Sequence, residues 1–161
     1  MSYPESRHAG PGLVNAVLRP ATAPPDLVTP VGSVGYLATG ATTDGALGLY
    51  RWSMGPRPSG PAPHFHRAMT ESFFVLTGTV RLYDGRTWVD AVEGDFLHVP
   101  VGGVHAFRNE SGAAAELLIL FTPGAPRERY FARLAEMAAA GVRQDEDERR
   151  AFLAEHDQFD A

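Results

Sequence analysis

The sequence contains no cysteine and no lysine among its 161 residues. Without cysteine there is no disulfide, no thiolate nucleophile, no thiolate-bound zinc and no ordinary iron–sulfur cluster. All 14 basic residues are arginine, so no side-chain amine can form a Schiff base with a carbonyl substrate or with pyridoxal phosphate. Aldolase-like and aminotransferase-like mechanisms are therefore excluded.

Clusters of positive charge and long hydrophobic runs are also missing. The formal net charge is −5 and no basic cluster is present, which argues against nucleic acid or an anionic membrane surface as a partner. No apolar stretch is long enough to span a bilayer, and residues 1–12 have no hydrophobic signal core. We expect a soluble, cytoplasmic protein whose partner is a small-molecule substrate, with no nucleic acid and no membrane.

Two short motifs carry most of the chemical information. The first, over residues 64–78, reads H-x-H-x4-E-x6-G, and the second, over residues 94–109, reads G-x5-P-x-G-x2-H-x3-N. In an extended strand, residues i and i+2 project from one face, so the rings of His64 and His66 can converge on one ion.

Glu71 and His105 complete the set if paired strands bring them back to the first two histidines. Three imidazoles and a carboxylate suit iron, manganese, nickel, copper, cobalt or zinc better than calcium or magnesium. Four protein ligands on an octahedral ion leave two positions open, which is typical of a reactive site and not of a structural one.

At these residues the chain resembles the cupin superfamily, whose two hallmark motifs it matches almost letter for letter. The family has a glycine six residues before the first histidine; this chain has Pro58 there, between Gly55 and Gly60, which we interpret as a shifted turn. The resemblance covers roughly residues 45–122. It implies an all-β fold, a single-domain (monocupin) jelly-roll β-barrel, with one divalent transition-metal ion per chain bound by His64, His66, Glu71 and His105.

The rest of the pattern predicts many short strands followed by helices. The 17 glycines and 13 prolines suit tight turns, and we predict strands over residues 32–38, 46–52, 71–76, 80–83, 87–92, 96–99, 104–108 and 116–121, with a possible one over 13–18. Helical spacing from residue 126 ends at Gly141, and a second helix spans residues 145–156. We therefore expect an N-terminal arm (1–30), the cupin β-barrel (31–123) and a C-terminal helical appendage packed on the barrel (124–161).

Strand parity predicts the lining of the pocket. Phe73 and Val75 share the face of Glu71, and Phe107 shares that of His105, so we predict Tyr50, Phe73, Val75 and Phe107 as substrate-binding residues. Parity alone leaves open whether Tyr50 or its neighbour Arg51 points inward. Both faces of residues 73–76 and 117–121 are apolar, so the outer face needs a cover, either the C-terminal helices or the partner in a homodimer. Cupins commonly dimerise.

The resemblance to quercetinase-like cupins implies a mononuclear non-haem metal dioxygenase acting on a small aromatic or enolic substrate, with Glu71 as the catalytic base. An alternative is a metal-dependent isomerase, cyclase or lyase of a small carbonyl compound, a sugar or a polyketide. There Glu71, His98 or a tyrosine would move protons, and Arg51 or Arg108 would hold an acidic substrate. A third reading is a non-catalytic small-molecule-binding cupin, although the chain lacks the basic recognition helix of regulatory proteins.

Overall fold

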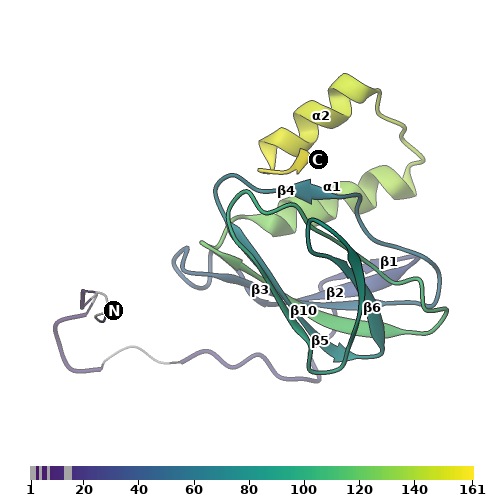
Figure 1. The fold of residues 1–161 in the computed structure, drawn as a ribbon. Helices are drawn as coiled ribbons and strands as arrows, with labels where there is room; N and C mark the ends of the chain where they lie inside the picture. The colour runs from purple at the N-terminus through teal and green to yellow at the C-terminus, as the bar shows by residue number, and fades with distance from the viewer. Residues whose placement is uncertain (1–2, 4, 7, 13–15) are drawn as a thin grey trace.

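The structure is a computed structural model that describes residues 3, 5–6, 8–12 and 16–161, and antiparallel β-strands make up most of the regular secondary structure in this part of the chain (Figure 1). The largest sheet has six strands in the order β1-β2-β3-β10-β5-β8. Their bounds are β1 (Leu27–Thr29), β2 (Gly32–Ala38), β3 (Gly48–Met54), β10 (Ala115–Thr122), β5 (Thr70–Thr77) and β8 (Phe96–Val99).

Two smaller sheets and two helices complete the fold. One sheet contains β7 (Trp88–Val92), β6 (Thr79–Tyr83) and β9 (Ala106–Arg108), and the other pairs β11 (Phe159–Asp160) with β4 (His64–Phe65). The helices are α1 (Arg127–Ala139) and α2 (Glu146–Glu155). No described helix combines the length and the apolar character needed to cross a bilayer.

The core lies between the inner faces of the sheets. Along β10 the residues alternate regularly between buried and half-buried positions, as strand parity requires. Phe73 of β5 and Phe107 of β9 meet with ring centroids 5.5 Å apart, and both are buried. The β3 register places Tyr50 inward and Arg51 outward, which settles the choice that parity left open. Antiparallel sheets packed around one core, with both helices near the C-terminus, are consistent with the jelly-roll fold.

The predicted strands match the observed ones, apart from their ends. The expected ranges 32–38 and 96–99 coincide with β2 and β8. The possible strand over 13–18 partly lies outside the described residues, and residues 16–18 form no strand. β1 falls within the segment expected to be an arm, so the sheet begins earlier than predicted. β4 and β11 have two residues each, too few for a periodic signal.

Of the two C-terminal helices, α1 packs against the inner side of the six-stranded sheet, and α2 packs on α1 through Phe152 and Tyr130. Phe131 of α1 lies 5.3 Å from the Tyr50 ring and 5.0 Å from the Trp52 ring, centroid to centroid. Figure 1 shows both helices together at one side of the sheets. The helices therefore do not cover the outer face, one of the two covers we expected: Phe74 and Phe96, paired across β5 and β8, remain 40% and 62% exposed.

The ends of the helices follow their sequence signals. Asp145 caps α2 by accepting the backbone N–H of Glu148, and the Glu148 side chain returns the contact to the Asp145 N–H. This capping box explains the acidic run at residues 145–148 as a structural feature. Gly141, one residue beyond the C-cap of α1, has φ of +62°, a conformation that favours glycine.

Candidate metal centre

Three elements bring the four predicted ligands together. His64 and His66 lie in β4 and directly after it, and Glu71 lies near the start of β5. His105 precedes β9 and pairs with His64 through two backbone hydrogen bonds of 2.9 Å, one in each direction. The alternation along β4 turns both of its histidine rings to one side, and the bridge sets His105 beside them.

The four side chains form a compact buried cluster. Each offers one ligand atom, and these atoms all lie within 4.8 Å of one another. Oε2 of Glu71 is 2.9 Å from Nε2 of His66 and 2.7 Å from Nε2 of His105. All four residues are buried. The structure thus assembles a group that can hold one metal ion, from residues predicted to do so.

Backbone carbonyls set the orientation of each imidazole. Nδ1 of His64 lies 2.9 Å from the carbonyl oxygen of Ala62, and Nδ1 of His105 lies 3.0 Å from that of Gly103. Nδ1 of His66 contacts the carbonyl oxygen of Asp157. A carbonyl only accepts hydrogen bonds, so each Nδ1 carries a hydrogen and each Nε2 faces the centre of the cluster. Metal-binding histidines are oriented by this type of contact.

When His66 and His105 are neutral, this arrangement turns the lone pair of each Nε2 toward Oε2 of Glu71, whereas a proton on Nε2 makes the same contact a hydrogen bond. Three such nitrogens and an ionised carboxylate repel one another unless a positive charge lies between them. A metal ion supplies that charge, and in its place a proton on Nε2 does so. The donor set therefore fits a borderline transition-metal ion.

The pKa values of the cluster reflect this balance between burial and charge. Burial lowers the pKa of His64 to about 4, with the charge of Glu71 opposing the shift. For His105, burial is the largest single effect and acts to lower the pKa, but the hydrogen bond with Glu71, the charge of Glu71 and the contact with the Gly103 carbonyl together raise it. For Glu71, burial acts to raise the pKa, whereas the hydrogen bonds from His105 and His66 hold it well below its usual range. The Glu71 carboxylate is therefore ionised at neutral pH.

A cavity of about 540 Å³ opens from the cluster toward the C-terminal helices. His64 and Glu71 lie in its wall, together with residues of β1, β2, β3 and α1, and most of the lining is apolar. Its charged side chains are Glu71, Arg127 and Arg149. Such a space accommodates a small, largely apolar molecule with few polar groups.

The structure places the four predicted substrate-binding residues in two groups. Phe107 lies in the wall of the cavity. Tyr50, Phe73 and Val75 point inward as parity predicts, but they are fully buried core residues outside the cavity lining. The Tyr50 hydroxyl donates to Oε1 of Glu128 on α1 at 2.5 Å, which secures the helix. Trp52 also lines the cavity, edge-on to Phe107.

The two arginines proposed as holders of an acidic substrate lie elsewhere. Arg51 pairs with Glu116, and Arg108 pairs with Glu110 and stacks on Trp88, all outside the cavity. That expectation is wrong because β3 parity turns Arg51 to the outer face.

His98 points away from the metal cluster as well. It is exposed, and its Nδ1 lies 3.0 Å from the Ser72 hydroxyl on the face of β5 opposite Glu71. It is therefore not placed to move protons in the cavity.

Arg127 is a cavity residue that the sequence analysis missed. It begins α1, is buried, and lies beside the aromatic rings of Phe121, Tyr130 and Phe131. A signal was present, because Arg127 occupies the first position of the apolar stripe that continues at Tyr130, Phe131 and Leu134 with spacing i, i+3, i+4 and i+7. An arginine within such a stripe projects toward the core side of the helix.

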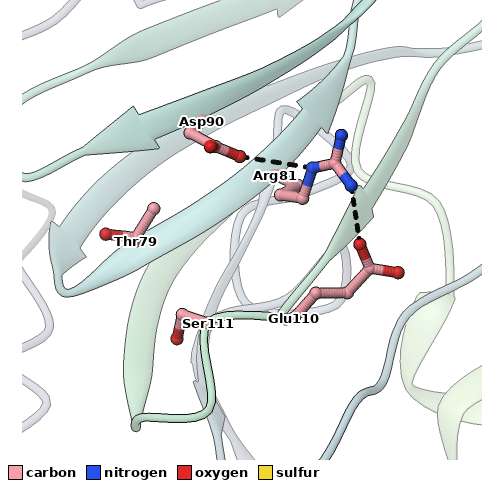
Figure 2. A pocket seen from close by; sticks show the side chains of 5 residues that line it. All are labelled: Thr79, Arg81, Asp90, Glu110 and Ser111. Carbon is pink, nitrogen blue, oxygen red and sulfur yellow. Dashed lines mark hydrogen bonds and ion pairs between the residues drawn. The ribbon is translucent and has the colours of Figure 1, made fainter.

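A second, smaller hollow lies on the outside of the three-stranded sheet (Figure 2). Arg81 lies between two carboxylates, with Nε 3.2 Å from Asp90 and Nη1 2.8 Å from Glu110. Arg81 Nε makes no well-aligned hydrogen bond, but its charge is already paired with two partly exposed carboxylates, so the hollow presents no unbalanced charge that would select a ligand.

A jelly-roll of antiparallel sheets with a buried three-histidine, one-carboxylate cluster defines a class of metal-binding β-proteins. Residues 50–121 match the family model of the cupin domain. Residues 50–121 of this chain therefore form a cupin domain.

Individual relatives support the family and the fold. Quercetin 2,3-dioxygenase from Bacillus subtilis (strain 168) is 33% identical over 75 residues, which is 47% of this chain and 22% of that enzyme. The structure of KdgF from Halomonas sp. superposes with a TM-score of 0.61 at 15% identity, covering 71% of this chain and 99% of that one. A predicted oxalate decarboxylase from Thermotoga maritima gives 0.57 at 20% identity, covering 66% and 97%.

The solved structures and the curated relatives support different conclusions. The two solved structures are too distant in sequence to show more than a common fold. This chain spans between 22% and 50% of the length of the curated relatives it matches. The comparisons therefore establish a cupin with a possible metal site, and leave the reaction to be argued from the cavity.

Proposed function

We propose that this cupin is a metal-dependent enzyme, a mononuclear non-haem metal dioxygenase acting on a small aromatic or enolic substrate. One observation carries the proposal: three imidazoles and a carboxylate form one buried cluster, and two of its members, His64 and Glu71, lie in the wall of a mostly apolar cavity. Four protein ligands leave room for a substrate atom and a second small ligand on an octahedral ion. The similarity to a quercetin 2,3-dioxygenase supports oxygen chemistry.

When bound, a redox-capable ion supplies Lewis acidity and electron transfer. The protein supplies orientation and exclusion of water. The carbonyls of Ala62, Gly103 and Asp157 hold the three rings in one tautomer. Trp52 and Phe107 give the nearby wall two aromatic faces, against which a planar substrate can lie.

Glu71 is the candidate base. Its Oε2 contacts two histidines, whereas its Oε1 makes no hydrogen bond with the described residues, and the side chain lies in the cavity wall. Oε1 is therefore available to accept the proton of an enol or phenol hydroxyl. The depressed pKa of Glu71 keeps the carboxylate ionised at neutral pH, which is the form a base requires, but it also makes the carboxylate a weaker base than an ordinary glutamate.

The same cavity also suits the alternative, a metal-dependent isomerase, cyclase or lyase of a small carbonyl compound. Such reactions usually need a second group that moves protons. Tyr130 is a candidate, since it lines the cavity together with Glu71. Zinc as the resident ion would favour this alternative, because zinc does not change its oxidation state.

The deciding experiment combines elemental analysis with oxygen uptake. Protein without a histidine tag is purified from cells supplied with a balanced mixture of iron, manganese, nickel, copper, cobalt and zinc. We expect about one redox-capable ion per chain, and its loss in His66→Ala. Oxygen consumption with flavonols or catechols then tests the dioxygenase.

Each other outcome has a clear meaning. Zinc alone, with no oxygen consumption, transfers support to the isomerase, cyclase or lyase. A folded protein that binds no metal refutes both enzyme proposals and leaves a small-molecule-binding cupin. The homodimer and the cytoplasmic location remain predictions, which the mass in solution and cell fractionation will test.

A further inference from the structure

Arg127 is a buried cation in the wall of the cavity. Only 4% of its surface is exposed. Its guanidinium carbon lies 4.2 Å from the ring centroid of Tyr130 and 5.1 Å from that of Phe121. Arginine remains protonated in proteins, so its charge persists in this apolar surrounding. A charge so placed is normally balanced by an anionic partner.

The structure provides no such partner. Nη1 donates to the carbonyl oxygen of His156 at 2.8 Å, and Nη2 donates to Oε1 of Gln158 at 3.2 Å. Nε is buried and makes no hydrogen bond, and no carboxylate in the described part of the chain lies within 4.0 Å of the guanidinium. Two of the five N–H donors of arginine are therefore used, both by neutral acceptors.

Other arginines of this protein show what a balanced guanidinium looks like. Arg149, also in the cavity wall, makes a two-point ion pair with the carboxylate of Asp160. Arg81 lies between Asp90 and Glu110 (Figure 2). Arg127 differs from both, since it is more deeply buried and has no counter-charge.

Arg127 also lies close to the metal cluster. The Phe121 ring is next to its guanidinium and, on the cluster side, makes an edge contact with His66 at 6.1 Å between centroids. Phe121 is also the cross-strand partner of Glu71. One aromatic side chain, that of Phe121, therefore lies between the guanidinium and the metal ligands. A small aromatic acid is long enough to span this separation.

The net charge of the metal-loaded site also favours an anionic substrate. A divalent ion beside the Glu71 carboxylate leaves one excess positive charge, and Arg127 adds a second within the same enclosed space. Low polarity around the cavity strengthens the attraction for an anion. A neutral substrate would leave both positive charges without compensation.

We propose that Arg127 binds the carboxylate of the substrate, so that the substrate is an aromatic or enolic acid with its acid group at α1 and its reacting oxygen at the metal cluster. The orientation toward the metal rests on the proposed function. Recognition of the carboxylate rests only on Arg127 and the cavity.

The competing explanation is that Arg127 only anchors the C-terminal segment through His156 and Gln158. Both explanations predict a loss of stability when Arg127 is replaced. Only carboxylate recognition predicts that the protein distinguishes a carboxylate from a neutral group of the same shape.

The test is calorimetric titration of the metal-loaded full chain with benzoate and with benzamide, which has nearly the same shape and no charge. We expect wild type to bind benzoate about 10- to 100-fold more tightly than benzamide, the range of one charge-assisted contact. We expect Arg127→Met to lose this preference and Arg127→Lys to keep part of it. Arg129→Met is the matched control, because Arg129 is exposed on the same helix, and it should retain the preference.

Several results would overturn the proposal. Equal affinities of wild type for benzoate and benzamide, or no detectable benzoate binding, would refute it without any variant, so the test does not depend on the folding of Arg127→Met. Benzoate binding that is unchanged in folded Arg127→Met would assign the anion to the metal ion instead. Because binding is measured without turnover, a failed oxygen-uptake assay would refute the dioxygenase and leave carboxylate recognition standing.

Discussion

Replacement of Asp157 by alanine is expected to weaken the fold and the metal site together. The backbone carbonyl of Asp157 accepts the hydrogen bond from Nδ1 of His66. Its carboxylate accepts hydrogen bonds from the backbone N–H groups of Arg67 and Ala68, at 3.0 and 2.9 Å. Residue 157 thus ties the loop after His66 to the C-terminal segment, although it lies 91 positions away from that histidine.

The size of the effect follows from these contacts. Two hydrogen bonds to a partly exposed carboxylate contribute about 2 kcal/mol in total. Asp157 has φ of +53°, a conformation that alanine adopts less readily than aspartate, which raises the cost slightly. For a chain of 161 residues, a loss of about 2 to 3 kcal/mol lowers Tm by about 5 to 10 °C.

Two further substitutions separate the loss of the carboxylate hydrogen bonds from the cost of the positive φ. Asp157→Asn keeps one acceptor and tolerates the positive φ, so it should lose least. Asp157→Gly loses both acceptors without the conformational penalty and should fall between asparagine and alanine. Alanine keeps the backbone carbonyl, but without the carboxylate contacts the C-terminal segment no longer holds that carbonyl firmly against Nδ1 of His66. Metal affinity, measured by competition with a chelator, should therefore fall about 10- to 100-fold in Asp157→Ala.

Asp147→Ala serves as the control, since this carboxylate of α2 is 94% exposed; it should leave metal affinity unchanged and cost at most about 0.5 kcal/mol of stability. If Asp157→Ala melts at the wild-type temperature and retains wild-type metal affinity, the C-terminal segment does not support the metal site, and the reasoning is wrong.

Three further predictions concern the cluster and its surroundings. Glu71→Gln should retain much of the metal but lose most turnover; intact activity, measured by oxygen uptake, would remove Glu71 from the role of base. In the metal-free protein, the pKa of His64 is about 4 in the folded state and 6.5 in the unfolded state. Between these two pH values the unfolded state binds more protons, so the folded state becomes less stable as the pH falls. Lowering the pH from 7 to 5 should therefore destabilise wild type by about 2 kcal/mol more than His64→Gln, by urea unfolding; an equal pH dependence would contradict it. Asn109→Ala should cost about 2 to 4 kcal/mol, because the buried amide donates to the carbonyls of Gly55 and Ala113; a cost below about 0.5 kcal/mol by denaturant unfolding would show that these bonds are dispensable.

Local patterns in the sequence were sufficient for most of the fold and for the ligand set. Once Glu71 was placed at the metal, alternation along 71–76 predicted that Phe73 and Val75 point inward, because side-chain direction in a strand is a property of the strand itself. The i, i+2 spacing of His64 and His66 joined two ligands for the same reason. The family motifs then supplied Glu71 and His105, which the structure brings to within 4.8 Å of the pair.

Contacts between distant segments were beyond the reach of such patterns. Short β4 and β11 carry no periodic signal, so their pairing, which brings the C-terminal segment beside the metal ligands, was not predicted. The side of the sheets on which the helices would pack was also open, since both faces of β5 and β10 are apolar.

The sequence by itself determined most of the strands, the helices, the metal-binding residue types and the absence of thiol and amine chemistry, because each depends on residue identity or short-range periodicity. Only the tertiary structure decided that α1 and α2 close the cavity, that Arg127 faces it without a counter-charge, and that the Asp157 carbonyl orients His66. These features require segments far apart in the chain to pack together, and packing depends on the shape and burial of whole surfaces.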